Sequence, residues 1–133
     1  MKGAKEIYKE DLDDTWFCVS NYQPMIEEFG NILVQVDDND YQGDSRVLYE
    51  KDNKIGYLNF GWGSCSGCDA LQACGNIDEV QDLMNGLKNS IKWFDCKADA
   101  LKYFNEHDWE GDYSWHEEEQ KQFIEKCKKV LSE

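Results

Sequence analysis

In the first half of the chain, three short segments rich in apolar residues are separated by polar ones, at residues 32–36, 46–51 and 54–60. These segments are rich in β-branched and aromatic residues, which favour strands. The polar residues 37–44 form a loop between the first two segments, and Asp52-Asn53 is a tight turn between the last two. The pattern therefore predicts a small antiparallel three-stranded meander.

Helical spacing replaces this pattern in the second half of the chain. Apolar residues three or four positions apart predict a helix over 77–91, with Asn76 as its N-cap and Glu79 three residues later. A short extended piece at 91–94 could add an edge strand. The apolar positions of the 77–91 helix are Ile77, Val80, Leu83, Met84, Leu87 and Ile91.

Two more helices are expected downstream and two upstream. Asp95 caps a helix through Phe104 that packs on Ala98, Leu101 and Phe104. A capping box at 114–117 opens a long C-terminal helix to about residue 131. Its stripe is Phe123, Cys127, Val130 and Leu131. Residues 4–13 form an amphipathic helix, Trp16, Phe17 and Val19 are core anchors, and a short helix over 25–29 ends at Gly30.

Together these elements predict an α+β fold: a three-stranded antiparallel meander, with a fourth edge strand as an option, packed with several helices. At 133 residues with one proline and no linker-like stretch, the chain is expected to be a single domain over 1–133.

The net charge of the chain limits which partners it can bind. The chain has 28 acidic and 14 basic residues and a net charge of −14. Nucleic acids and anionic membranes bind through clustered lysines and arginines, so general binding to either is not expected. A basic protein surface is the expected partner. The sequence shows no secretion signal and no long apolar run, so we expect a soluble, cytoplasmic protein whose cysteines stay reduced or bind metal.

The segment 61–74, GWGSCSGCDALQAC, has the most unusual composition of the chain. Three glycines in seven residues predict a special turn after the third strand, with a positive φ at Gly63 or Gly67. The simplest interpretation of its cysteines is structural, because free cysteine packs as a small hydrophobic residue. The alternatives are that the cysteines bind a metal, form a redox pair or act as a nucleophile.

Cys65 and Cys68 are spaced as half of a structural zinc site. Cys74 and a distant fourth ligand would complete it, with His116 as the candidate and His107, Cys96 and Cys127 as alternatives; otherwise the protein has no cofactor. A redox dithiol at Cys65 and Cys68 is the next alternative, although no Lys or Arg between residues 55 and 87 lowers a thiol pKa. A single nucleophilic cysteine with a histidine base is the last. No catalytic residues are assigned.

Two polar segments remain. Asp38, Asp40, Gln42 and Gly43 resemble the start of a calcium loop, but no acid stands at its closing position, so a polar hairpin loop is favoured. Residues 106–119 hold seven acids and no Lys or Arg. Aromatic anchors among acids are typical of a face that binds a basic protein. The candidate interaction residues are Trp62, Trp109, Tyr113, Trp115, Glu117, Glu118 and Glu119.

The segment carrying GWGSCSGCD, with IKWFD and YSWHE downstream, resembles small uncharacterised proteins of bacteria and their phages. That resemblance implies no known activity. By analogy it favours a non-catalytic acidic binding protein, a phage-type inhibitor of a host defence protein that acts by protein–protein contact. The alternatives are a thiol-dependent redox protein or enzyme, and a small-ligand sponge with Trp62 and the glycine turn in its pocket. For the sponge, the net charge disfavours anionic ligands unless a local basic pocket overrides it.

Overall fold

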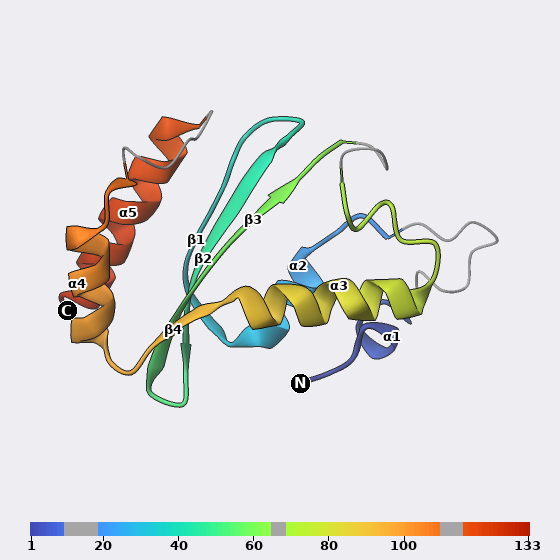
Figure 1. The fold of residues 1–133 in the computed structure, drawn as a ribbon, viewed down its shortest axis with the longest axis horizontal. Coiled ribbons are helices and arrows are strands. Elements are labelled where there is room, and N and C mark those ends of the chain that lie inside the picture. Colours follow the sequence, from blue (N-terminus) through green and yellow to red (C-terminus); the bar gives the residue numbers. More distant parts are fainter. Residues whose placement is uncertain (10–18, 65–68, 110–115) are drawn as a thin grey trace.

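The computed structural model describes residues 1–9, 19–64, 69–109 and 116–133 (Figure 1). The N-terminal part contains α1 (Ala4–Ile7), α2 (Gln23–Ile26) and the 3₁₀ turn η2 (Glu27–Phe29), then the strands β1 (Asn31–Asp37), β2 (Gly43–Lys51) and β3 (Lys54–Trp62). The C-terminal part contains α3 (Ile77–Ser90), β4 (Lys92–Phe94), α4 (Lys97–Glu106) and α5 (Glu117–Leu131). The α+β fold class is confirmed.

All neighbouring strands of the sheet are antiparallel, in the order β1-β2-β3-β4. The tight turn between β2 and β3 is confirmed: Asp52 and Asn53 have φ of 52° and 66°. Two central residues with positive φ suit the right-handed twist of a hairpin. The optional fourth strand is β4, which pairs with the beginning of β3. The meander therefore has four strands.

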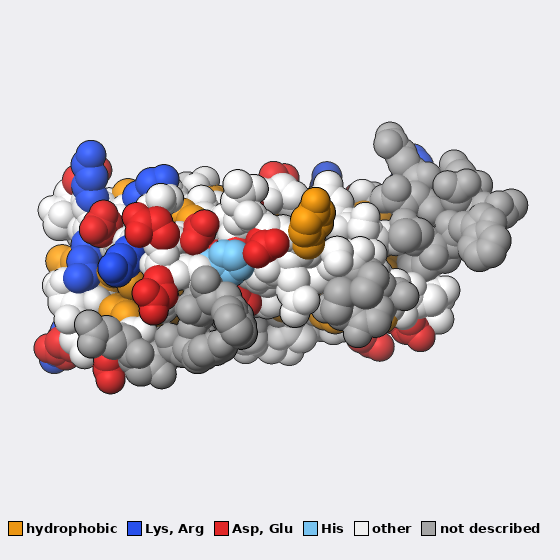
Figure 2. Space-filling model, turned by 90° about the horizontal axis from the view of Figure 1, so that it is seen from above, with side chains coloured by type: hydrophobic (Ala, Val, Ile, Leu, Met, Phe, Trp, Pro, Cys, Tyr) orange, Lys and Arg blue, Asp and Glu red, His pale blue; other side chains and the backbone are white. Residues whose placement is uncertain are grey.

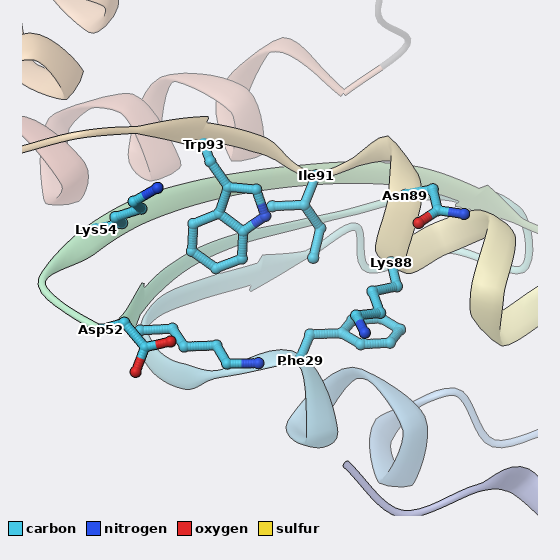
Figure 3. A pocket seen from close by; sticks show the side chains of 8 residues that line it. Phe29, Asp52, Lys54, Lys88, Asn89, Ile91 and Trp93 are labelled. Carbon is cyan, nitrogen blue, oxygen red and sulfur yellow. The ribbon is translucent and has the colours of Figure 1, made fainter.

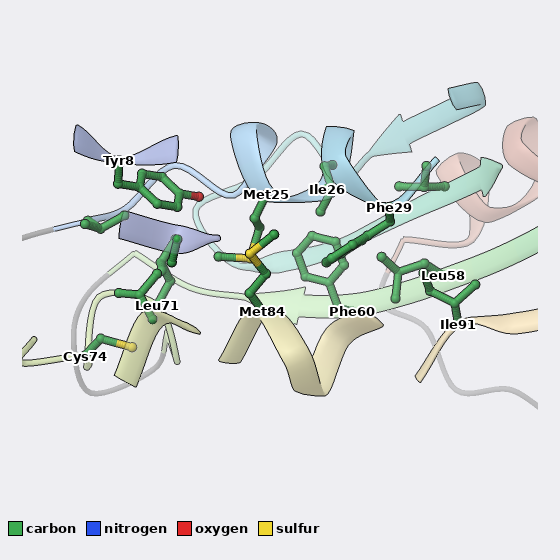
Figure 4. Close-up of a cluster of buried hydrophobic side chains, with 14 of the residues drawn as sticks. Tyr8, Met25, Ile26, Phe29, Leu58, Phe60, Leu71, Cys74, Met84 and Ile91 are labelled. Atoms are coloured by element: carbon green, nitrogen blue, oxygen red, sulfur yellow. The ribbon is translucent and has the colours of Figure 1, made fainter. Parts of the chain in front are cut away.

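The sheet has helices on both faces (Figure 1). Because side chains alternate along a strand, β2 and β3 contribute to two separate cores. The first lies under α1, α2 and α3 and the second under α4 and α5. Figure 4 shows the first, where Met25, Phe29 and Met84 are at most 1% exposed. Full burial of side chains this large stabilises a fold by roughly 1.5–3 kcal/mol each.

Most of the expected helix faces are confirmed. Val80, Met84 and Ile91 are buried, and Asn76 caps α3 by accepting a hydrogen bond from the backbone N–H of Glu79 at 2.9 Å. Phe123, Cys127 and Leu131 form the buried stripe of α5.

Three details of the sequence predictions are wrong. The N-cap of α4 is Cys96, with no side-chain cap bond, and Asp95 precedes it. Ala100 rather than Ala98 is buried on α4, because Ala100 stands four positions before the buried Phe104 and therefore on the same face of the helix. The last helix begins at Glu117 because His116 has a non-helical backbone, with φ −121° and ψ 63°.

Some expectations concern residues outside the described part of the chain. The predicted helix 4–13 is seen as α1, which ends at Ile7, and residues 10–18 are outside the description together with Trp16 and Phe17. Gly63 does not have the left-handed backbone that the sequence allowed for it, since no described glycine does, and Gly67 lies outside the described residues. In the part of the chain that is described, no helix has the length and apolar character needed to span a membrane.

Candidate functional site

The turn between β1 and β2 is built around the buried carboxylate of Asp38, which is 4% exposed. Its Oδ1 accepts a hydrogen bond from Arg46 Nη1 at 2.7 Å, and its Oδ2 accepts one from the Asp44 backbone N–H at 2.7 Å. A Cβ at Gly43 would lie 2.6 Å from the Asp38 Cβ, so this close approach requires glycine. The segment is a polar hairpin loop, as the sequence favoured, with its first aspartate turned inward.

Arg46 is the only arginine in the chain and is 2% exposed. Besides Asp38, its Nη2 lies 3.8 Å from Asp44 Oδ2. Burial raises the pKa of Asp44 above its usual value, although the neighbouring Arg46 guanidinium acts in the opposite direction. A buried cation held by one buried and one partly exposed carboxylate therefore organises this end of the sheet.

His116, just before α5, lies over this turn. Its Nε2 is 3.6 Å from Asp40 Oδ2 and 3.9 Å from Asp38 Oδ2, and its Nδ1 is 3.8 Å from Glu119 Oε2. Possible ligand atoms of Asp38, His116 and Glu119 lie within 4.8 Å of one another. A metal ion there would share Asp38 with the Arg46 guanidinium, and two adjacent cations repel each other, so the arrangement disfavours a metal.

The outer surface of this end of the sheet is acidic. Tyr41 projects from the turn and is 83% exposed, and its backbone N–H donates to Asp40 Oδ1 at 2.7 Å. Figure 2 shows acidic side chains gathered beside a histidine on this side of the molecule, with an exposed hydrophobic side chain nearby. We call this surface the acidic tip; it consists of Asp37, Asp40, Tyr41, His116, Glu117, Glu118 and Glu119.

The sequence-predicted interaction residues divide between the acidic tip and the core. Glu117 and Glu118 are exposed, and Glu119 is half-buried beside His116. Trp109 stacks on Phe104 with ring centroids 5.5 Å apart, and its Nε1 donates to the Phe104 carbonyl at 3.0 Å. This ring is therefore part of the second core. Tyr113 and Trp115 lie outside the described residues.

Sequence reasoning missed Tyr41 and Arg46. Tyr41 is an aromatic residue in an otherwise polar hairpin loop, and Arg46 is the single arginine, within a strand. Both features are visible in the sequence. Their positions relative to Glu117 and His116 depend on how α5 packs on β1, which sequence spacing does not give.

Of the four predicted zinc ligands, only Cys74 and His116 lie in the described part of the chain, and these two are not neighbours. Cys65 and Cys68 lie outside the described residues. Cys74 is 9% exposed in the first core, and its Sγ lies 3.4 Å from the Ala70 carbonyl, to which it donates. His116 lies beside α5, which covers the other face of the sheet. The hypothesis of a site with Cys65, Cys68 and Cys74 stays open, and His116 is placed with carboxylates instead.

Thiol reactivity should follow this burial. Burial raises the pKa of Cys127, and burial followed by Glu79 and Asp69 raises that of Cys74, so both stay protonated. In native protein at pH 8, iodoacetamide should modify exposed Cys96 at least about tenfold faster than Cys74 or Cys127, as measured by peptide mass spectrometry. Equal rates for all three in native protein would contradict the packing described here.

Trp62 lies in a polar hollow of about 350 Å³ near the acidic tip. Its Nε1 donates to Ser45 Oγ at 2.9 Å, and Gly63 also lines the hollow. The same wall carries the carboxylates of Asp37, Asp38 and Asp69. The expected pocket beside Trp62 therefore exists, but its charge suits neutral or cationic groups rather than anions.

Comparison with protein-family models, with curated proteins and with solved structures finds no match for this chain.

Proposed function

We propose that this chain is a non-catalytic binding protein whose acidic tip docks onto a basic surface of a partner protein. The observation that carries this proposal is Tyr41, which is 83% exposed next to Asp40, in the turn where Asp40 lies 3.6 Å from His116. Exposed large aromatic side chains are frequent anchors of protein interfaces, and surrounding charges steer the partner toward them.

The charge of the acidic tip supports a basic partner. The arginine next to it is 2% exposed and held by Asp38, so it adds little positive charge to the surface. The whole chain carries a net charge of −14, which adds a long-range field of the same sign. The resemblance to small phage proteins makes host defence proteins with basic surfaces the partner class to test first.

Reversing two charges at the acidic tip tests this proposal. Glu117→Lys with Glu118→Lys should slow association with the partner by about tenfold or more at low salt, and the difference should shrink as salt rises, because exposed charges are screened beyond ~8 Å at physiological ionic strength. Tyr41→Ser should act mainly on the dissociation rate, because it removes an anchor rather than a charge. The partner is identified by affinity capture from host extract, and rates are measured by surface plasmon resonance.

The matched control is Asp82→Lys with Glu125→Lys, which changes the net charge equally at exposed positions elsewhere on α3 and α5. It should slow association much less than the variant at the acidic tip. Circular dichroism checks that each variant is folded. Equal slowing by both pairs, or a captured partner whose binding ignores Tyr41→Ser, would contradict docking through this surface.

The thiol-dependent alternative depends on Cys65 and Cys68, which lie outside the described residues. Replacing both with serine separates the two functions. A binding protein whose fold survives keeps its partner, whereas thiol chemistry is lost.

A further inference from the structure

A second hollow lies at the opposite end of the sheet, next to the turn between β2 and β3. Its volume is about 440 Å³, within the range of small-molecule sites. Phe29, Ile91 and Trp93 form its apolar part, and lysines from three places stand around it (Figure 3). We call it the lysine pocket; the lysines are Lys51, Lys54 and Lys88.

Two of these lysines face each other across the hairpin. Lys51 and Lys54 are direct partners in the register of β2 and β3. Like charges directly opposite each other in a sheet are destabilising. Within the described residues, Lys54 has an ion pair with Asp95 at 3.9 Å, at positions 56% and 88% exposed, which contributes little. This register therefore maintains a local concentration of positive charge that an anion would relieve.

The third lysine comes from the end of α3. Figure 3 shows Lys88 and Trp93 reaching into the same hollow, with Asp52 and Lys54 on the side of the turn. Among the described residues, Asp52 is the one carboxylate that lines the hollow, against three lysines. A net positive pocket on a chain with twice as many acids as bases is the reverse of the overall charge. The overall composition of the chain therefore does not explain why positive charge is concentrated at this pocket.

The apolar part of the pocket presents an aromatic ring to solvent. Trp93 is 38% exposed, one of the few large hydrophobic side chains that are exposed among the described residues. It packs closely over Gly56 of β3, where a Cβ would come within 2.7 Å of the indole Cζ3. Gly56 thus allows the indole to lie against the sheet, with part of its surface open beside the buried ring of Phe29.

We propose that the lysine pocket binds a nucleoside phosphate, with the base on Trp93 and the phosphates between Lys51 and Lys88. A planar aromatic ring stacks on an exposed indole, and a phosphate supplies the negative charge that the facing lysines need. A purely inorganic anion would leave Trp93 unused, and an uncharged aromatic ligand would leave the lysines unneutralised. This site is independent of the acidic tip, which lies at the other end of the hairpins.

Isothermal titration calorimetry at low salt tests the proposal with AMP, ATP, GTP and cyclic di-AMP as probes. At least one nucleotide should bind with a Kd below about 1 mM, and adenosine and inorganic tripolyphosphate should each bind at least about tenfold more weakly than that nucleotide. Lys51→Glu and Lys88→Glu should each weaken binding by about tenfold or more, since each removes a charged contact to phosphate. Trp93→Ala should weaken it by a similar factor and Trp93→Phe by less.

The matched control is Lys92→Glu. Lys92 neighbours Trp93 in β4 but faces the other core, with its Nζ 5.8 Å and 5.2 Å from the ring centroids of Phe94 and Tyr103. The same change of charge there should leave the affinity within about threefold, because that surface lies across the sheet. Absence of binding by all four nucleotides, tripolyphosphate binding as tightly as ATP, or equal losses from Lys92→Glu and Lys51→Glu would each overturn the proposal.

Discussion

Replacing Arg46 with methionine should lower the free energy of unfolding by about 3–5 kcal/mol, the cost of leaving one partner of a buried ion pair behind. Arg46 and Asp38 have side-chain exposures of 2% and 0%, and their closest atoms are 2.7 Å apart. Without the guanidinium, the Asp38 carboxylate keeps the Asp44 N–H as a donor but loses its buried counter-charge. Urea unfolding followed by circular dichroism measures this loss.

The double variant Arg46→Met with Asp38→Asn distinguishes the net contribution of the ion pair to stability from the destabilisation caused by leaving one buried charge unpaired. An asparagine at 38 still offers an oxygen to the Asp44 N–H and carries no charge. The double variant should therefore be more stable than Arg46→Met alone by at least about 1 kcal/mol. An unchanged urea midpoint for Arg46→Met would contradict the burial of this pair. If the double variant is less stable than both single variants, the two positions are not coupled through their ion pair.

The same pair links stability to the proposed binding surface. Asp38 Oδ2 lies 3.9 Å from His116 Nε2, which lies 3.6 Å from Asp40 Oδ2, so a shift of Asp38 would reach residues of the acidic tip. Losing Arg46 should thus disturb the acidic tip more than the lysine pocket at the far end of the sheet. Nucleotide affinity of the folded Arg46→Met variant is a useful internal reference for that comparison.

Local sequence patterns were sufficient for most of the secondary structure. β-Branched residues at 32–36 and the Asp52-Asn53 turn identified β1 and the hairpin of β2 and β3 correctly. The apolar spacing of Val80 and Met84 identified the inner face of α3. These features depend on neighbours within a few positions, where chain geometry is nearly fixed. Helix starts were less well predicted, as at Glu117, because tertiary contacts of His116 determine that end.

The candidate sites were harder to predict because each combines distant segments. The acidic tip joins the turn between β1 and β2 to the start of α5. The lysine pocket joins Lys51 and Lys54 to Lys88 and Trp93, and only the strand register reveals that the first two lysines face each other. Net charge indicated a basic partner, but an average over the chain hides a local pocket of opposite sign.

The meander itself explains why the two surfaces are separate. In a hairpin sequence β1-β2-β3, the turn after β1 and the turn after β2 lie at opposite ends of the sheet (Figure 1). The first turn carries Asp38, Asp40 and Tyr41, and the second carries Asp52 between Lys51 and Lys54. Acidic and basic surfaces are thus held apart by the length of the strands, so variants at one end should not alter binding at the other.

Replacing Asp69 with alanine should be the second most damaging change, lowering the free energy of unfolding by about 3 kcal/mol. The Asp69 side chain is buried, with 4% of the residue exposed. Its Oδ1 accepts hydrogen bonds from the Tyr22 hydroxyl at 2.8 Å, the Leu71 N–H at 2.9 Å and the Gln72 N–H at 3.2 Å. Its Oδ2 accepts one from the Gly63 N–H at 3.1 Å. Alanine leaves these buried donors without this acceptor.

Tyr22→Phe is the matched control, because it removes only one of the four donors. Burial first, and then the hydrogen bond to Asp69, raise the pKa of Tyr22, so its hydroxyl remains a donor at neutral pH. This variant should cost about 1 kcal/mol, the usual net value of one hydrogen bond. A loss as large as that of Asp69→Ala would mean that packing of the tyrosine ring, and not the carboxylate, stabilises this region.

Hydrogen exchange can locate the effect of Asp69→Ala. The carboxylate ties Gly63, just after β3, to the turn at residues 69–72. Its loss should therefore speed exchange of the Leu71 and Gln72 amides by about tenfold or more, beyond the change expected from global stability. Amides of α5, on the other face of the sheet, should change only as much as global unfolding requires. A uniform change at all amides would argue against Asp69 as a local anchor. Selective change at Leu71 and Gln72 would show that the Asp69 carboxylate holds Gly63 and the turn at residues 69–72 together, on the two sides of Cys65 and Cys68 in the sequence.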